Sequence, residues 1–380
     1  MPSACSPQAG QHHPATFVAL LGASAASLAM LASESASANA AWEGGFTVVY
    51  QATNDERIDA EATASIDLMG SWETRRGAWF VYIEASSATR DDGISAAYPT
   101  ANADAGSVLA QDDVGGIQVS ELNYTFSANP ARTLTVGLID PTAWLDRSRI
   151  TNDENLHFVN GSFVNNATIE FPDYTLGFVS EWRARPGVPQ LTLIVTGSDG
   201  IADTPDRSYQ NLLDVTSDER GVFLGLGASW LYDRWSLRLG AWGRSDEHDV
   251  VNRPGSEEGN YGAYGVVTYR DGGTAFNLRA GAANPRVSVA GEFVALAVER
   301  EFSGGLFGAG IARTTIADGF RTSATASATD AEVFFRLPIF RGAGHLTPSV
   351  QYIRNPDFNA TGSVANVSSV IFGARLHVAF

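Results

Sequence analysis

A-N-V-S-S-V-I-F-G-A-R-L-H-V-A-F, from Ala365 to Phe380, is the end of the chain. Apolar and polar residues alternate in it, which predicts a strand with two different faces. An aromatic residue at the last position is unusual in an edge strand of a soluble protein, whereas a lipid-facing barrel strand places one at the membrane interface. The stretch therefore favours an outer-membrane barrel over the closing strand of a β-sandwich. The apolar face holds Val370, Phe372, Ala374, Leu376, Val378 and Phe380, and the polar face holds Ser369, Gly373, Arg375 and His377.

The ending Leu-His-Val-Ala-Phe resembles the C-terminal strand by which outer-membrane barrels are recognised for assembly. This resemblance implies that the barrel assembly machinery is a partner through Phe380. Outer-membrane lipids are the partner expected for the apolar face. The chain is therefore expected in the outer membrane of a Gram-negative bacterium, exported through the periplasm.

The first 40 residues have the features of a secretory signal. The apolar run from Ala15 to Ala32 is followed by Ala38-Asn39-Ala40, a small-x-small cleavage site. No Lys or Arg precedes the run, although signals usually begin with a positive charge. We expect residues 1–40 to be cleaved and residues 41–380 to form the barrel, with an uncleaved membrane anchor as the alternative. Cleavage would remove Cys5, the one cysteine, and leave no disulfide.

The composition excludes some classes of function. The chain has 42 Asp and Glu residues against 25 basic residues, all of them Arg, so its net charge is −17. An acidic chain without a basic stripe is not expected to bind nucleic acid. No apolar run after residue 40 reaches the roughly 18 residues of a transmembrane helix. The mean hydropathy of −0.06 does not separate a soluble protein from a barrel, because the two faces of barrel strands average out.

Alternating stretches of about ten residues, the length that a tilted strand needs to cross a bilayer, follow from Trp42 onward. They predict an all-β fold: a transmembrane, antiparallel, up-and-down β-barrel of about 16 strands. The strands are expected near residues 42–53, 57–71, 77–88, 114–127, 131–139, 174–185, 188–198, 219–232, 234–246, 259–270, 273–283, 287–301, 305–315, 328–340, 343–354 and 366–380.

The connections between these strands alternate in length. Short turns are expected at 127–130, 185–188, 232–234, 271–273 and 303–305, which contain turn-forming residues such as Asn, Pro, Asp and Gly. Longer segments are expected at about 89–113, 140–173, 199–218, 247–258, 316–327 and 355–365. Short turns on one rim and long loops on the other are typical of outer-membrane barrels, with the turns in the periplasm and the loops outside the cell.

The alternation also assigns side chains to the two faces of the wall. A charge facing lipid near the bilayer centre costs about 2–4 kcal/mol, so charged residues are expected on the inner face. Strands 287–301 and 305–315 do not alternate cleanly, so no face is assigned to Glu299 or Arg313, and a β-bulge would account for this. The inner face is expected to hold Glu121, Asn123, Glu181, Arg183, Arg238, Trp242, Arg244, Asn277, Arg279, Glu332, Arg336, Gln351 and Arg375.

Three stretches resemble the carbohydrate-selective porins of Gram-negative outer membranes, the OprB type. The most specific is Leu346-Thr-Pro-Ser-Val-Gln-Tyr-Ile-Arg-Asn-Pro356; the others are residues 137–166, with Thr151-Asn-Asp-Glu-Asn155, and Glu332-Val-Phe-Phe-Arg336 with the closing strand. The resemblance covers most of residues 120–380. It implies a sixteen-stranded barrel through which monosaccharides and related small carbohydrates diffuse down their gradient. The absence of Lys departs from the family and leaves the substrate open.

A pore selective for neutral sugars needs flat polar groups for hydroxyls and aromatic rings for the C–H face of a pyranose. Arg supplies a rigid fork of donors, and Glu and Gln accept. The alternative is that inward Arg and Glu only pair across neighbouring strands. The candidates for contact with sugar in the pore are Arg183, Arg238, Trp242, Arg279, Arg336, Arg375, Glu121, Glu181, Glu332 and Gln351.

The long segment 140–173 is the second candidate site, because loops of this length inside a compact domain are usually functional. We expect it to fold inward and narrow the pore; capping the barrel from outside is the alternative. Adjacent Asp153 and Glu154 also suggest Ca²⁺, but two acids without an ordered ligand loop are usually only solvated. The candidates for the constriction are Trp144, Arg147, Arg149, Asp153, Glu154 and Phe158.

No nucleophile elbow, phosphate loop or His-x-x-x-His pair is present in the sequence, so no enzyme activity, metal or cofactor is expected. Two other functions remain. One keeps the barrel but makes the channel general or selective for anions such as sugar acids; the other is a secreted, soluble β-sandwich that binds glycans. The sequence leaves open whether the protein is a monomer or a trimer.

Overall fold

The computed structural model describes residues 40–108, 114–183, 185, 187–202, 209–213, 220–321, 326–355 and 368–380. The expected signal segment lies outside the described residues except for Ala40, the first residue of β1. The strands of the barrel are β1 (Ala40–Thr53), β2 (Glu61–Glu73), β3 (Gly77–Ser86), β4 (Gly116–Asn129), β5 (Arg132–Ile139), β6 (Thr175–Trp182), β7 (Gln190–Gly197), β8 (Val222–Leu231), β9 (Trp235–Arg244), β12 (Tyr261–Asp271), β13 (Thr274–Ala283), β14 (Ala290–Phe302), β15 (Gly305–Ile316), β16 (Ser327–Ile339), β17 (Gly344–Arg354) and β18 (Ser368–Ala379).

The other elements are short and lie in the connections between barrel strands. They are a two-stranded ribbon of β10 (His248–Asp249) and β11 (Glu257–Glu258), the helices α2 (Ile94–Ala97) and α3 (Gly161–Val164), and the 3-10 helices η1 (Pro99–Ala101), η2 (Pro141–Ala143), η3 (Tyr209–Leu213), η4 (Asp318–Phe320) and η5 (Phe340–Gly342). Among the described residues, no helix has the length and apolar character needed to cross a membrane.

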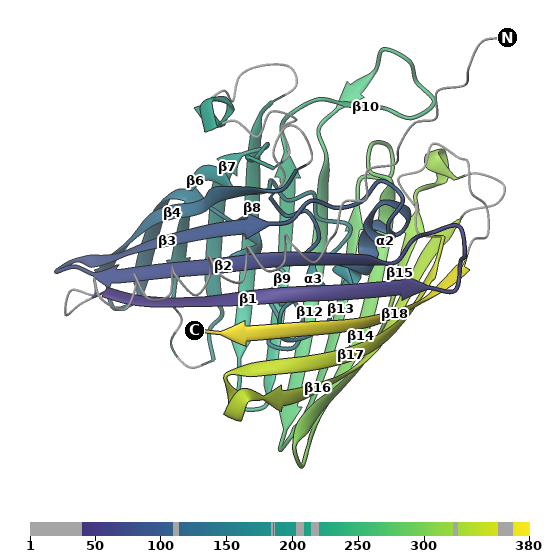
Figure 1. The fold of residues 1–380 in the computed structure, drawn as a ribbon. Coiled ribbons are helices and arrows are strands. Elements are labelled where there is room, and N and C mark those ends of the chain that lie inside the picture. Colours follow the sequence, from purple (N-terminus) through teal and green to yellow (C-terminus); the bar gives the residue numbers. More distant parts are fainter. Residues whose placement is uncertain are drawn as a thin grey trace, which may run out of the picture.

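The sixteen strands form one closed antiparallel sheet, which confirms the predicted fold class and strand count. Closure is made by the chain ends: β1 pairs with β18, with Gly45 opposite Ala379. Figure 1 shows β18, in yellow, directly beside β1, in purple. A closed sheet leaves no unpaired edge strand. The soluble β-sandwich alternative is therefore wrong, because a sandwich consists of two separate open sheets.

The connections sort to the two ends of the barrel as predicted. Tight turns such as those at Gly272 and Gly304 join β12 to β13 and β14 to β15; both glycines have positive φ, 56° and 93°, which L side chains rarely adopt. We call this the turn end, and the opposite rim, with the long connections, the loop end. Two connections at the loop end, 54–60 and 284–289, are shorter than their neighbours.

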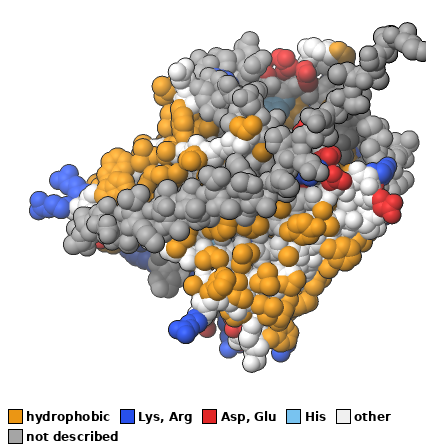
Figure 2. Space-filling model, in the orientation of Figure 1, with side chains coloured by type: hydrophobic (Ala, Val, Ile, Leu, Met, Phe, Trp, Pro, Cys, Tyr) orange, Lys and Arg blue, Asp and Glu red, His pale blue; other side chains and the backbone are white. Residues whose placement is uncertain are grey.

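The two faces of the wall also alternate as expected. On β8, Leu226 is half exposed on the outer face, whereas the neighbouring Phe223 is fully buried on the inner face. Hydrophobic side chains cover the visible outer surface of β16, β17 and β18, and charged side chains gather toward the ends (Figure 2). Aromatic rings pair on this outer face near the turn end, as between Trp235 and Tyr269, whose centroids are 4.4 Å apart. This is the arrangement of a membrane-interface girdle.

The strands without a clear pattern contain the expected irregularity. The register of β14 and β15 shifts between Ala290 and Glu292, which confirms the β-bulge. Beyond it, Glu299 is buried on the inner face and Arg313 is exposed on the outer face. The pattern was weak because the inner face here is apolar: Ala295, Ala297 and Ala312 pack against side chains that fill the barrel.

Candidate functional site

The connection between β5 and β6, residues 140–174, lies inside the barrel and is called the inserted loop below. Its first turn is ordered by Asp140, whose Oδ1 accepts from the Thr142 amide at 2.8 Å. Helix α3 is capped by Asn160, whose Oδ1 accepts from the Ser162 amide at 3.0 Å. These caps satisfy backbone groups that water would otherwise have to satisfy. The loop can therefore keep an ordered path across the lumen.

Arginines on the inner wall hold the backbone of the inserted loop. Arg279 on β13 is fully buried and donates to the carbonyl oxygens of Phe163 at 3.0 Å and Asp146 at 3.2 Å. Its Nη1 also lies 3.5 Å from the Asp146 carboxylate. Arg375 on β18 donates to the carbonyl of His157 at 2.7 Å, and to that of Glu154. A guanidinium with several donors can bind carbonyls of a passing chain in this way.

Acceptors on the neighbouring strands hold the same loop through its amide groups. Glu332 on β16 accepts from the amides of Val159 at 3.2 Å and Asn160 at 2.9 Å. The Asn160 side chain in turn donates to Gln351 on β17 at 2.9 Å. Arg336, also on β16, donates to the Leu156 carbonyl. Together with the two arginines above, these contacts attach one side of the loop to β13, β16, β17 and β18.

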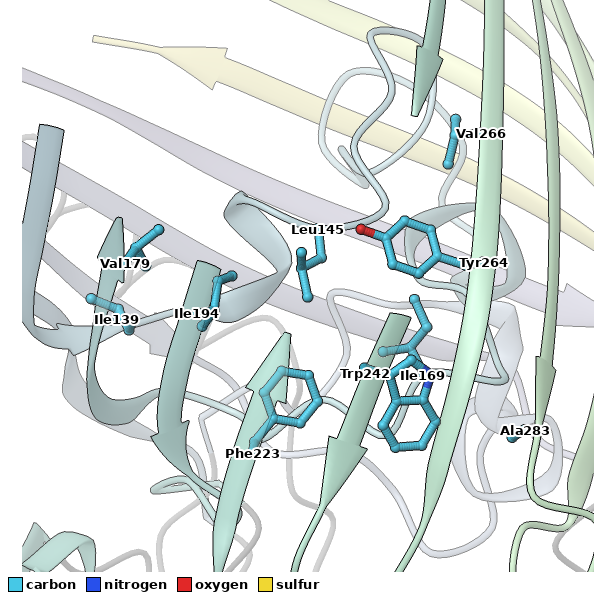
Figure 3. Packing of buried hydrophobic residues seen from close by; sticks show 10 residues of the cluster. All are labelled: Ile139, Leu145, Ile169, Val179, Ile194, Phe223, Trp242, Tyr264, Val266 and Ala283. Carbon is cyan, nitrogen blue, oxygen red and sulfur yellow. The ribbon is translucent and has the colours of Figure 1, made fainter. Parts of the chain in front are cut away.

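Apolar side chains attach the loop at two further places. Leu145 lies among Ile194, Phe223, Tyr264 and Trp242 of the wall (Figure 3). Near α3, the Phe158 ring packs on the Phe163 ring, with centroids 4.6 Å apart, and edge-on against Phe334 at 5.0 Å. The wall makes room at Gly310, where a Cβ atom would lie 2.6 Å from a ring carbon of Phe163. The barrel interior is thus partly a hydrophobic core.

A second connection, between β3 and β4, also enters the barrel, and sequence reasoning missed this. The carbonyl oxygen of Ala101 accepts from Gln51 on β1 and from Gln351 on β17, both at 2.8 Å. Asp104 accepts from Ser65 on β2 at 2.8 Å. Its Ile94 and Tyr98 are buried against Ile353 on β17 and Ile371 on β18, but small and polar residues dominate the rest of the segment, as in an ordinary exposed loop. Buried Gln at inner positions of two strands was the available signal.

Several residues expected to line an open pore are instead covered by the inserted loop. Their exposed fractions are 0% for Arg279, 3% for Arg375, 1% for Glu332, 1% for Gln351 and 4% for Trp242. All five face inward as predicted, but the loop carbonyls, amides and apolar side chains occupy their binding groups. They therefore position the loop and do not present a surface to a solute. Alternation predicts the face of a residue but not what covers it.

The remaining candidates also divide into residues that are buried and residues that keep exposed surface. Glu121 is buried, and its carboxylate accepts from Asn123 at 3.2 Å. Glu181 is partly exposed and accepts from Thr133 at 3.4 Å, and Arg183 is exposed just beyond the end of β6. In the inserted loop, Trp144 packs against the Leu145 cluster and Phe158 is buried, whereas Arg147, Arg149, Asp153 and Glu154 keep exposed surface.

A pocket of about 410 Å³ lies between the inserted loop and β1, β2 and β18 at the turn end, and we call it the amide pocket. Its polar groups form a chain: His377 to Thr47 at 3.0 Å, Thr47 to Asn155 at 2.5 Å, and Asn155 to Asp67 at 3.2 Å. Asp67 also accepts from Tyr82 at 2.6 Å. Asp153 and Glu154 of the loop line the same pocket. Asp67, Tyr82, Asn155 and His377 were not among the predicted site residues.

A second pocket lies where the inserted loop faces β9 and β12, also at the turn end, and we call it the arginine pocket. The loop contributes Arg147 and Arg149, β9 contributes Arg238, and β12 contributes Arg270. The first three were predicted, and Arg270 was not. One aspartate, Asp233, lines the pocket with them. The amide pocket and the arginine pocket are thus separated by residues 150–151 of one loop.

Within the described residues, no group of three or more His, Cys, Asp or Glu side chains has the geometry to hold a metal ion. Asp153 Oδ1 instead accepts from the amides of Asn155 at 3.0 Å and Leu156 at 2.8 Å. This is an Asx turn, which uses the carboxylate to shape the loop. The role that the structure shows for the Asp153 carboxylate is to accept backbone hydrogen bonds within the loop.

No protein-family model matches the sequence, and no curated protein matches it. Solved structures do match. OprB of Pseudomonas putida is 11% identical with a TM-score of 0.68, over 90% of this chain and 94% of that one. The anion-selective porin from Comamonas acidovorans is 12% identical with a TM-score of 0.57, over 90% and 99%. A mutant of the Rh. blastica porin is 15% identical with a TM-score of 0.51, over 90% and 100%. The predicted likeness to carbohydrate-selective porins is confirmed at the level of fold, and the chain has the barrel fold of the porins.

Proposed function

We propose that this protein is an outer-membrane porin through which small carbohydrates diffuse passively. The apolar outer face and the aromatic pairs near the turn end suit a barrel that spans the bilayer. The fold shared with OprB of Pseudomonas putida and with an anion-selective porin supports a channel. Outer-membrane barrels have short turns in the periplasm, so the turn end is expected there. Outer-membrane lipids and the assembly machinery, through Phe380, are the partners that this location implies.

The observation that carries the proposal is the inserted loop, with a polar pocket on either side of it. A loop fixed across the lumen at so many points reduces the free cross-section, and a pocket remains beside it at two places near the turn end. The amide pocket presents carboxylate, amide, imidazole and phenol groups, which can both donate to and accept from sugar hydroxyls. Selective passage requires contacts of this kind that are weak enough to release the solute.

The test is solute flux through the purified full-length protein in liposomes. Swelling rates are compared for glucose and for a neutral amino acid of similar size, with protein-free liposomes as the control. Faster uptake of glucose supports a carbohydrate channel. Equal rates would support a general porin instead, and swelling no faster than in protein-free liposomes would overturn the channel function. Extraction of cells with salt and then detergent tests the location, because an outer-membrane barrel is released only by detergent.

A further inference from the structure

The arginines inside the barrel are of two kinds. Arg279 and Arg375 are buried, and their Nη donors are used by carbonyl groups of the inserted loop. Arg238 of the arginine pocket is partly exposed, and its Nη1 donates to Ser229 at 2.9 Å. Arg147 and Arg149 are exposed toward the same pocket. The second kind therefore has donors left for a solute.

The charges of this pocket are not balanced by the protein. Among the described residues, no carboxylate lies within 4 Å of the guanidinium of Arg147, Arg149, Arg238 or Arg270 in a salt bridge. Arg147 and Arg149 are near enough to Arg238 for the like charges to repel. Two negative charges oppose this repulsion: Asp233 lines the pocket, and Glu181 on the wall attracts the guanidinium of Arg238 electrostatically. Arg234 is also present, but it pairs with Asp271 at 3.2 Å.

The location increases the effect of this imbalance. The pocket lies between the inserted loop and the wall, where low-dielectric surroundings focus the field of clustered charges. Five arginines line the pocket, four of them without a salt bridge to any described residue, in a protein whose net charge is −17. Guanidinium groups bind carboxylates and phosphates through paired, charge-assisted hydrogen bonds, and rings of Arg select for anions in pores. Ser148 and Ser236 line the same pocket and can serve the hydroxyl groups of the solute.

We infer that the arginine pocket is a binding site for a small oxyanion, a carboxylate or a phosphate, carried by a sugar-sized solute. This deepens the proposed channel function and rests on it. Neutral sugars would pass the amide pocket and the arginine pocket alike, whereas acidic sugars would be held transiently at Arg238 and its neighbours before release at the turn end. The site thus makes sugar acids or sugar phosphates the preferred solutes.

The test uses the full-length protein in planar bilayers. The ion current is titrated with glucose, gluconate and glucose 6-phosphate, and the last two distinguish a carboxylate from a phosphate ligand. We expect block of the current by at least one of the two anions at lower concentration than by glucose. Arg238→Gln is expected to weaken that block about tenfold, the effect of one charge-assisted hydrogen bond. Arg238→Lys, which keeps the charge, is expected to weaken it less.

Arg253→Gln is the matched control, because Arg253 is exposed in the connection between β9 and β12 and lies outside both pockets. It should leave the block unchanged. The inference is overturned if the channel conducts but glucose and both anions block it equally, or if Arg238→Gln and Arg253→Gln behave alike. Absence of any conductance would instead overturn the channel function itself, so the two failures are distinguishable.

Discussion

Replacing Arg279 with Ala should release the inserted loop from the wall. Arg279 is fully buried and contacts Asp146, Phe163 and Val164 on two separate parts of that loop. Its removal takes a donor from each of their carbonyl oxygens, although Asn152 still donates to those of Phe163 and Val164. It also leaves the Asp146 carboxylate, 1% exposed, without its cation. The loop is then expected to leave its docked position for part of the time, which widens the lumen.

The size of the effect follows from the buried ion pair. Removing one partner of such a pair costs about 3–5 kcal/mol, because an uncompensated charge stays buried. This shifts the equilibrium between docked and released loop by roughly a hundredfold to several thousandfold. Burial raises the pKa of Asp146 to about 6, while Arg279 acts to lower it. Without Arg279 that pKa must rise further, so the cost should be small at pH 5, where Asp146 takes up a proton, and full at pH 8.

The assay is single-channel conductance in planar bilayers at pH 5 and pH 8. Arg279→Ala should conduct more, and with more current noise, than the unmodified protein at pH 8 and resemble it more closely at pH 5. The double variant Arg279→Ala, Asp146→Ala removes both charges, so it should have a weaker pH dependence than the single variant. Arg253→Ala serves as the control. If Arg279→Ala matched the unmodified protein in conductance and noise at both pH values, the assignment of Arg279 as an anchor would be refuted.

Three further predictions concern the wall and the loop end. Leu226→Arg, in the middle of β8 on the outer face, should destabilise the barrel folded in vesicles by about 2–4 kcal/mol. Val222→Arg, near the end of the same strand, should destabilise it by at most about 1 kcal/mol. Equal destabilisation by the two variants would contradict the assignment of the lipid-facing band. Gly310→Ala places a methyl group 2.6 Å from an aromatic carbon of the inserted loop, so it should destabilise the docked loop by about 1–3 kcal/mol and raise conductance; an unchanged channel would argue against tight packing there. His248 donates to the Glu170 carboxylate, 3.0 Å away, and this hydrogen bond raises the pKa of His248 above its ordinary value. His248 therefore stabilises the fold at pH values below about 6.5 and loses this contribution as the pH rises through the raised pKa. His248→Gln should be less thermally stable than the unmodified protein at pH 6 and similar to it at pH 9, and an equal difference at both pH values would exclude the ionised pair.

The barrel could be predicted from the sequence because its physical cause is local. Each strand must place apolar side chains outside and polar ones inside, so the pattern repeats at every second residue and survives changes of individual residues. Where the inner face does not have to be polar, strands are harder to predict from the sequence. Strands β14 and β15 face the apolar side chains of the inserted loop, so their inner face carries mostly Phe, Leu, Ala and Gly, and no alternation of apolar and polar residues is visible.

The candidate site was predictable only in part, because it depends on contacts between distant segments. Alternation correctly placed Arg238 and Arg279 on the inner face, but it could not show that one faces a pocket and the other is covered by Phe163 and Val164. A buried arginine bound to backbone carbonyls and one available to a solute have the same local sequence signature. Ala101 itself gives no sign that it enters the barrel, because its contact uses a backbone oxygen; the available signal lay in its donors, Gln51 and Gln351, at inner positions of β1 and β17.

The shared carbonyl oxygen of Ala101 has a consequence for the order of folding. Its two donors, Gln51 and Gln351, are 300 positions apart along the chain, and their strands are brought near one another only when β1 has joined β18. The Ala101 carbonyl oxygen can therefore accept both hydrogen bonds only after the barrel has closed. Seating of this segment therefore follows closure of the barrel, and an intermediate in which β1 and β18 are still apart would expose the interior to water and to proteases.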